Sequence, residues 1–293
     1  MANVKELRGR IKSVSNIAQI TKAMEMVASM KLRKVQARAL SSRPYTEEIV
    51  ALGRHLSDCV SGDAELPLFK AREVKTVGVF LVSSDRGLCG AYNANVTSRL
   101  HRFIDEQKSE HGRDVKLYIY GRKGYGYFYR RGFDVEKFFV EPPLDKMDFD
   151  AARAVVKELV GGFESGLLDE VRVFHTAFLS PARFEPTNLE FLPVPRSGLE
   201  DDVDHSMEFD YLLEPDAQTL LNRLLPKYLE TIVYDAMLQS LAAEHASRRI
   251  AMKGATDAAS RMSVELRRIY NRARQESITK ELLDIVGGTA AVS

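Results

Sequence analysis

The glycine-rich stretch Asp85-Arg86-Gly87-Leu88-Cys89-Gly90 is the part of this 293-residue sequence whose residue types come nearest to a known chemistry. It follows an apolar β-type run, 75–83, and precedes a helical pattern, 93–108. Loops in that position bind phosphates in α/β proteins. This loop lacks the lysine and hydroxyl of a P-loop, and no GxxxxGK followed by Ser or Thr occurs in the chain. We therefore predict a tight structural or partner-docking turn in preference to a nucleotide site.

Other reactive residue types are too dispersed to predict a catalytic or metal site. The six histidines are scattered, with no two four residues apart and none beside a cysteine, so no zinc site is predicted. Two cysteines, Cys59 and Cys89, form no disulfide framework and fit a reducing compartment. The stretch 121–126 has its glycines in the wrong order for GxGxxG and is predicted to be a packed turn. We predict no catalytic residue, no cofactor and no metal.

The middle of the chain alternates strand and helix patterns. Buried or half-buried strands are predicted at 75–83, 115–120, 134–140, 171–179 and 189–194. Between them lie predicted helices at 93–108 and 149–163 and a short aromatic helix or turn at 122–131. This alternation predicts a Rossmann-like α/β domain with a largely parallel five-stranded sheet. Pro193 and Pro195 favour an edge position for the last strand.

The two ends of the chain are predicted to be long helices. Residues 2–42 and 227–286 lack proline, and each carries one glycine. We expect the first helix to weaken at 41–44 and a second helical piece to run over 44–60. The apolar stripe of the first helix is Val4, Leu7, Ile11, Val14, Ile17, Ile20, Met24 and Val27. That of the last helix is Leu229, Ile232, Ala236, Ala243, Ala246 and Ile250, then Ala251, Ala255, Ala258, Met262, Leu266, Ile269 and Ala273.

Spacings of three and four in the first stripe favour winding about another helix. The first helix could form a homodimer, but two long stripes flanking a globular insert are explained more simply by an antiparallel two-helix coiled coil. We predict three parts: residues 1–60 as the N-terminal coiled-coil helix, 74–212 as the α/β insert domain, and 213–293 as the C-terminal coiled-coil helix.

Charge is distributed unevenly, although the net charge is only +1. Residues 1–43 carry ten basic residues against two acidic ones, and residues 248–280 carry nine against three. Residues 134–216 carry seven basic residues against twenty acidic ones. The two helical ends thus form a basic rod, whose partner could be nucleic acid phosphates or a ring of protein carboxylates. Few aromatic residues interrupt the rod, which disfavours single-stranded nucleic acid. No apolar run is long enough to span a membrane and no secretory signal is evident.

Four longer stretches of this sequence form recognisable motifs: 20–28 (ITKAMEMVA, followed by Lys31, Arg33 and Lys34), 84–90 (SDRGLCG), 252–259 (MKGATDAA) and 270–288 (YNRARQESITKELLDIVGG). Together they resemble the gamma subunit of rotary F-type ATP synthases. The resemblance covers the chain from end to end and departs from the family pattern at Ala91, Ala258 and Gly288.

The resemblance implies a non-catalytic central rotor shaft that carries torque between a membrane ring of c subunits and a catalytic hexamer of alpha and beta subunits. It implies an insert at the foot of the shaft against the epsilon subunit, with delta in the same complex. It places the chain peripherally on the cytoplasmic face of the bacterial plasma membrane, in a proton- or sodium-driven enzyme. The residues that match hexamer-contact positions are Met24, Arg248, Gln275, Thr279 and Glu281, and the family-motif loop is marked by Asp85, Arg86, Gly87 and Gly90.

Two other functions remain open on the sequence alone. A basic coiled-coil protein could bind nucleic acid through the rod, with an affinity that falls steeply with salt. A nucleotide-using α/β enzyme would need the loop at 85–90 to bind phosphate. The rotor interpretation itself predicts no nucleic acid partner.

Overall fold

The structure, a computed structural model, describes residues 4–59, 67–194 and 217–292. They form two compact units, one drawn from residues 1–30 and 248–293 and the other from residues 31–247. The first and last helices, α1 (Val4–Cys59) and α5 (Ala217–Val292), contribute residues to both units. The predicted domain boundaries at 60 and 212 lie outside the described residues, so that division of the chain stays a prediction.

The larger unit contains a five-stranded sheet in the order β3-β2-β1-β4-β5. The pairs β1–β2, β1–β4 and β2–β3 are parallel, and β4–β5 is antiparallel. This confirms the predicted largely parallel sheet with the last strand at an edge. The elements are η1 (Pro67–Phe69), β1 (Thr76–Val82), α2 (Tyr92–Ser109), β2 (Asp114–Tyr120), α3 (Arg122–Tyr129), β3 (Val135–Phe139), η2 (Leu144–Lys146), α4 (Phe149–Glu164), β4 (Glu170–Ser180) and β5 (Arg183–Leu192).

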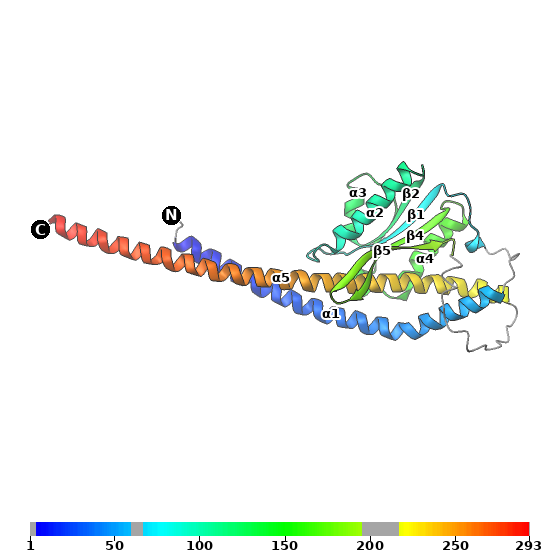
Figure 1. The fold of residues 1–293 in the computed structure, drawn as a ribbon, viewed down its shortest axis with the longest axis horizontal. Helices are drawn as coiled ribbons and strands as arrows, with labels where there is room; N and C mark the ends of the chain where they lie inside the picture. Colours follow the sequence, from blue (N-terminus) through cyan, green and yellow to red (C-terminus); the bar gives the residue numbers. More distant parts are fainter. Residues whose placement is uncertain (1–3, 60–66, 195–216, 293) are drawn as a thin grey trace. The chain divides into compact units, whose positions relative to one another are not determined.

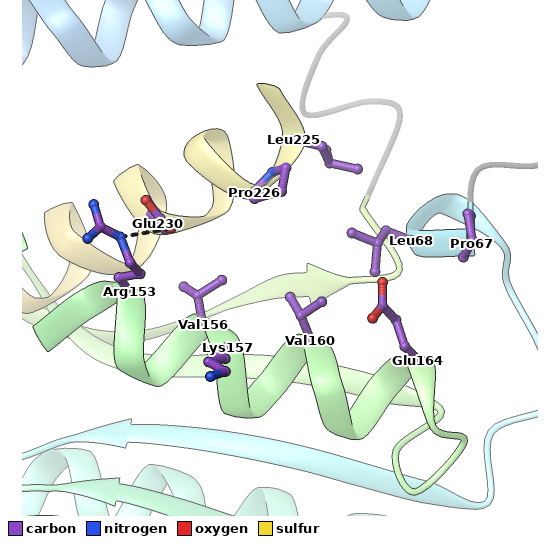
Figure 2. A pocket seen from close by; sticks show the side chains of 10 residues that line it. All are labelled: Pro67, Leu68, Arg153, Val156, Lys157, Val160, Glu164, Leu225, Pro226 and Glu230. Carbon is purple, nitrogen blue, oxygen red and sulfur yellow. Dashed lines mark ion pairs between the residues drawn. The ribbon is translucent and has the colours of Figure 1, made fainter. Parts of the chain in front are cut away.

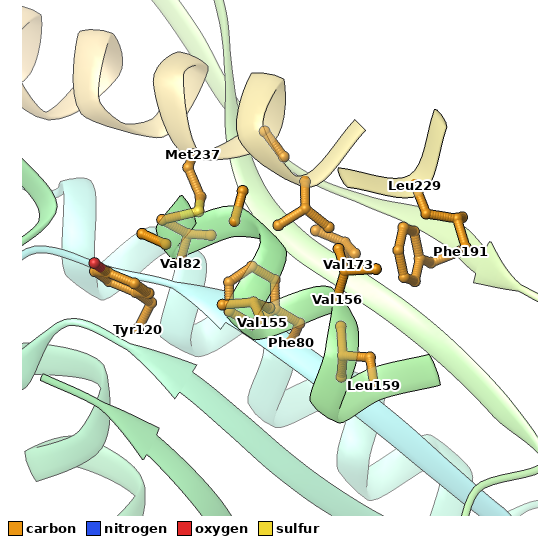
Figure 3. Packing of buried hydrophobic residues seen from close by; sticks show 14 of the residues in the cluster. Phe80, Val82, Tyr120, Val155, Val156, Leu159, Val173, Phe191, Leu229 and Met237 are labelled. Carbon is orange, nitrogen blue, oxygen red and sulfur yellow. The ribbon is translucent and has the colours of Figure 1, made fainter. Parts of the chain in front are cut away.

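Helices cover both faces of the sheet because the central strand β1 is apolar on both sides (Figure 1). Successive side chains of a strand point to opposite faces. Val77, Val79 and Leu81 pack with α2 and α3 in one cluster. Phe80 and Val82 pack with α4 and α5 in another, where Met237 and Leu229 of α5 also lie (Figure 3). The last helix is therefore part of the core of the insert.

Polar contacts also hold α1 in the larger unit. Lys31 Nζ pairs with a carboxylate oxygen of Asp145 at 2.8 Å, and this contact lowers the pKa of that carboxyl. Arg38 donates to the carbonyl oxygen of Met147 at 2.6 Å and to the hydroxyl of Tyr234 on α5 at 3.0 Å. One stretch of α1 is thereby fixed to both η2 and α5.

The smaller unit contains an antiparallel pair of helical segments, as predicted for the coiled coil. The hydroxyls of Thr21 on α1 and Thr256 on α5 lie 2.8 Å apart. A groove further along the pair is lined by Val4, Lys5 and Arg8 from the start of α1 and by residues 270–281 of α5. Residue numbers rise on one helix as they fall on the other, so the chain directions are opposite.

The predicted stripes are wrong in phase over part of their length. From residue 17 onward Ile17, Ile20 and Val27 are exposed. Small or polar residues occupy the seam instead, and on α5 Met262 and Ile269 are likewise exposed. Small side chains allow the helices to approach closely. Close packing therefore determines which residues face the partner helix more than their hydrophobicity does. The side chains that are buried or half-buried along the seam include Ala18, Thr21 and Ala28 on α1 and Met252, Thr256, Ala259, Ser263 and Leu266 on α5.

Two other sequence predictions differ from the structure. The helix α1 does not break at 41–44 but continues through Pro44. Its backbone remains helical there, and the hydroxyls of Ser41 and Ser42 bond back to the carbonyls of Arg38 and Ala39. The strand β5 begins at Arg183, earlier than the predicted 189, and includes Pro186. An edge strand tolerates proline because one side of it needs no donor.

Candidate functional site

The loop between β1 and α2 is held by the carboxylate of Asp85. Its Oδ1 accepts from the backbone N–H of Arg122, the first residue of α3, at 3.2 Å. Its Oδ2 accepts from the backbone N–H of Leu144 in η2 at 3.1 Å. A carboxylate therefore occupies the N-terminal end of α3, where the helix dipole favours negative charge. The loop carries its own anion at this position, which disfavours a bound phosphate there.

A second set of bonds closes the loop on itself. The side chain of Asn93 accepts from the N–H of Ser84 at 3.1 Å and donates to Cys89 Sγ at 3.1 Å. Ser84 Oγ donates to the carbonyl of Arg86 at 2.7 Å. Cys89 is buried and packs with Tyr92 and with Ala243 of α5. Its thiol is thus a packing group inside a rigid turn.

Leu88 is the feature of this loop that sequence reasoning missed. Its φ is +62°, in the left-handed region that side chains rarely adopt, and 65% of it is exposed. Gly90 two residues later also has positive φ, at +58°. A side-chain-bearing residue held in this region marks a constrained loop and motivates a functional hypothesis. No sequence pattern signalled this conformation.

We expect Asp85→Ala to destabilise the larger unit by about 1–3 kcal/mol, because two backbone N–H groups lose their acceptor. Asp85→Asn keeps one side-chain oxygen and should cost less. Denaturant unfolding of the purified chain measures both. Asp134→Ala, at an exposed acidic residue on the same domain, is the control. An Asp85→Ala variant as stable as Asp134→Ala would show that the carboxylate does not hold the loop.

The predicted hexamer-contact residues lie on the helices of the smaller unit. Met24 and Arg248 are half-buried, and Gln275, Thr279 and Glu281 are exposed. Gln275 and Thr279 are four residues apart and share a helix face. Glu281 accepts from Ser277 at 3.3 Å and lines the groove near the start of α1. The structure thus puts three of the five on one exposed segment of α5.

The exposed apolar stripe on α1 was also not predicted from the sequence, which placed most of its residues in the seam. Residues displaced from the seam recur at spacings of three and seven on the outside of the helix, and each is about half exposed or more. Such a stripe on a soluble helix indicates a partner surface. Its members are Ile17 (51% exposed), Ile20 (59%), Val27 (46%) and Met30 (62%).

The larger unit also has a groove of about 640 Å³ between α4 and the first turns of α5 (Figure 2). Its walls include Val156, Val160 and Leu225. Glu230, only 6% exposed, pairs with Arg153 at 3.4 Å and with Lys227 on its own helix at 2.9 Å. Its lining contains no histidine, cysteine or hydroxyl side chain; its charged members are Arg153, Lys157, Glu164 and Glu230.

Within residues 4–59, 67–194 and 217–292, no three or more His, Cys, Asp or Glu side chains are grouped so as to hold a metal ion. Over the same residues, no helix is both long and apolar enough to cross a bilayer. The described part of the chain presents a hydrogen-bonded loop with an exposed leucine and a helix with an exposed apolar stripe.

The chain is thus an α/β domain inserted between two long helices, which pair antiparallel in one unit. Comparison with known proteins identifies the family. A family model described as ATP synthase matches residues 3–292. The ATP synthase gamma chain of Janthinobacterium sp. (strain Marseille) is 40% identical over 296 residues and is matched over the whole of both chains. That of Herminiimonas arsenicoxydans is 40% identical over 300 residues, again over both whole chains. The chain belongs to the ATP synthase gamma chain family.

Solved structures share the fold. A chain in the OSCP/F1/c-ring structure of the Euglena gracilis mitochondrial ATP synthase, in rotational state 3, has a TM-score of 0.67. It is 18% identical, and the match covers 99% of this chain and 94% of that one. A chain in the central stalk/c-ring structure from Tetrahymena thermophila has a TM-score of 0.59 at 24% identity, over 80% of this chain and 99% of that one.

Proposed function

We propose that this chain is the central rotor stalk subunit of an ion-driven ATP synthase. It transmits torque between the membrane ring of c subunits and the catalytic alpha/beta hexamer. The observation that carries the proposal is the antiparallel helix pair whose outer face bears an apolar stripe, in a chain that matches gamma chains over its full length. A shaft needs an inner seam for stiffness and an outer surface for its bearing, and α1 has both.

The chain itself performs no chemistry in this proposal. It imposes asymmetry on the hexamer by binding differently to the conformations that the catalytic subunits adopt as it turns. A ligand shifts such equilibria only by its differential affinity for the states, and a rotating asymmetric shaft supplies that difference in turn to each site. The coupling ion is a proton or sodium.

Met24, Arg248, Gln275, Thr279 and Glu281 are the proposed contacts to the hexamer. Three of them are exposed on the last part of α5, where α5 also presents exposed apolar side chains such as Ile278 and Leu282. Arg248 and Met24 are half-buried and act at the edge of the seam. The mixture of apolar and basic surface suits a bearing that attracts acidic loops over distance without fixed deep contacts.

The loop with Asp85, Arg86, Gly87 and Gly90 is proposed as a docking point for another subunit through Leu88. Epsilon, delta and the c-ring complete the set of partners, and the chain acts peripherally on the cytoplasmic face of the bacterial plasma membrane. A nucleic-acid-binding role has only the basic charge of the rod in its favour. The gamma chains among the relatives give it no support.

The test is co-expression with alpha and beta subunits from the same source, followed by size exclusion, ATP hydrolysis, and ATP-driven ion pumping in membrane vesicles. We expect one copy of this chain with three of each partner. Arg248→Glu and Met24→Lys should lower pumping relative to hydrolysis, while Arg102→Glu, a charge reversal at an exposed residue of α2, should leave the ratio unchanged.

Two outcomes would contradict the proposal. Intact coupling in both variants would remove the contact assignments. Failure to assemble, together with salt-sensitive binding to DNA, would instead favour the nucleic-acid role.

A further inference from the structure

The strand β4 is longer than its parallel neighbour β1. Its residues pair with β1 only from Glu170 to Phe174, whereas its pairing with β5 continues to Ser180. Beyond Phe174 the strand has lost the neighbour on one side. The backbone N–H of Thr176, buried in this stretch, donates to the side-chain oxygen of Ser240 on α5 at 3.0 Å. A helix hydroxyl therefore takes the place of a strand neighbour.

A second hydroxyl of α5 makes an equivalent bond to the loop after β1. Ser247 Oγ donates to the carbonyl oxygen of Cys89 at 2.6 Å. Ser240 and Ser247 are seven residues apart, about two turns, so they project from one face of the helix. Both are buried, at 0% and 6% exposure. Ser240 accepts a hydrogen bond from the insert, and Ser247 donates one to it.

The surface between these two bonds is apolar and closely packed. Ala243 lies midway along the helix between the serines and contacts Cys89 and Tyr92. Phe178 and Phe184 pack against the same cluster. Apolar contacts of this kind are strong but have no direction. The two hydrogen bonds add directional links between α5 and the insert at this interface.

Hydroxyl side chains inside helices usually bond to a carbonyl of the preceding turn. Two threonines of α5 do so: Thr231 donates to Lys227 O at 2.8 Å, and Thr256 to Met252 O at 2.9 Å. Ser240 and Ser247 differ, because their hydroxyls bond to backbone groups of the insert. Chance placement of small polar residues on a helix does not explain two such exceptions on one buried face.

We propose that Ser240 and Ser247 form a polar clamp that fixes the α/β insert on the C-terminal helix against rotation and sliding. The inference rests on the proposed rotor function, which requires the insert and α5 to turn as one body. Turning α5 about its axis, or moving it along the sheet, breaks both bonds. The buried N–H of Thr176 then loses its acceptor, and the carbonyl oxygen of Cys89 keeps only the longer bond from the N–H of Tyr92, at 3.3 Å. The two serines are thus positioning residues for torque transfer.

The first test measures the clamp in the purified full-length chain. Amide hydrogen exchange at Thr176 should be about tenfold faster in Ser240→Ala than in the wild type, because the N–H loses its acceptor. Thr231→Val, which removes a buried α5 hydroxyl bonded within its own helix, should leave the Thr176 rate unchanged. Equal rates in Ser240→Ala and wild type would overturn the clamp, whatever the chain does in a synthase.

The second test measures torque in the assembled complex in inside-out vesicles. In the double variant Ser240→Ala/Ser247→Ala, ATP-driven ion pumping per ATP hydrolysed should fall about fivefold. Thr231→Val should keep the wild-type ratio. The ratio does not depend on how much folded complex is present, so lower stability alone would not change it.

The outcomes separate the clamp from the rotor function. Faster exchange at Thr176 with a wild-type pumping ratio would overturn the mechanical role of the clamp and leave the rotor function intact. Failure of the wild-type chain to assemble with the hexamer would contradict the rotor function, and with it the torque role, while the exchange result would still decide whether the bonds hold the insert.

Discussion

Replacing Gly121 with alanine is expected to destabilise the α/β insert by roughly 4 kcal/mol or more, the range reached only by severe core defects. Gly121 stands between β2 and α3 with φ at +102°. A Cβ there would lie 2.1 Å from the carbonyl oxygen of Ser83 and 2.6 Å from its carbonyl carbon. Those atoms are backbone at the end of the central strand, so they cannot rotate away. Denaturant unfolding of the full chain measures the loss.

A matched control separates the clash from the backbone conformation. Gly132 also has positive φ, at +74°, but nothing lies within 4 Å of a Cβ built on it. Gly132→Ala should therefore cost only the left-handed penalty, about 1–2 kcal/mol. If the two variants were equally stable, the close approach of Ser83 to Gly121 would not be what requires glycine.

The same contact explains how far the sequence could predict this region. The pattern at 121–126 indicated a packed turn but not what it packs against. In the structure the hydroxyl of Ser83 accepts from Gly124 N–H at 2.9 Å and donates to the carbonyl of Tyr120 at 3.1 Å. Ser83 directly follows β1 and lies about forty residues before the turn that it contacts. Their meeting follows from the parallel pairing of β1 with β2, which local sequence does not encode.

Periodicity predicted the secondary structure well where one signal dominated. The strand β1 was predicted from an unbroken apolar run, and α4 from inward positions such as Val155 and Leu159, both buried. The coiled coil was harder, because α1 carries apolar residues on two faces. Reading hydrophobicity alone placed Ile17 and Ile20 in the seam, whereas Ala18 and Thr21 lie there. An exposed apolar stripe and a seam of small side chains that lie one residue apart cannot be told apart without the partner helix.

The candidate site was likewise predicted only in part. The position of the motif at 85–90 was predicted from the sequence, but the contacts that its residues make were not. The bonds of Asp85 to α3 and η2 and the outward Leu88 depend on tertiary neighbours. Likewise, Ser240 and Ser247 looked like ordinary small residues of a helical seam. Their role is visible only because β4 extends past β1.

Acidification is expected to destabilise the chain through His175, which is 2% exposed on β4. Burial lowers the pKa of this imidazole to about 4, and the backbone at Val173 offsets the effect only in part. The unfolded chain has a pKa near 6.5 for the same group. Between these values the unfolded state binds a proton that the folded state does not. The free energy of unfolding should therefore fall as the pH drops from about 6.5 toward about 4, by about 3 kcal/mol in all.

The variant His175→Leu isolates this contribution. Leucine keeps the site apolar and removes Nδ1, which has no hydrogen-bond partner among the described residues. Other groups also titrate: the lowered pKa of Asp145 adds to acid loss, and the raised pKa of Asp235, caused by burial, opposes it. Both are common to the two proteins, so the difference between their unfolding curves from neutral to acidic pH reports His175. Stability of the variant should be flatter with pH, and parallel curves would mean that His175 is protonated without cost in the folded chain.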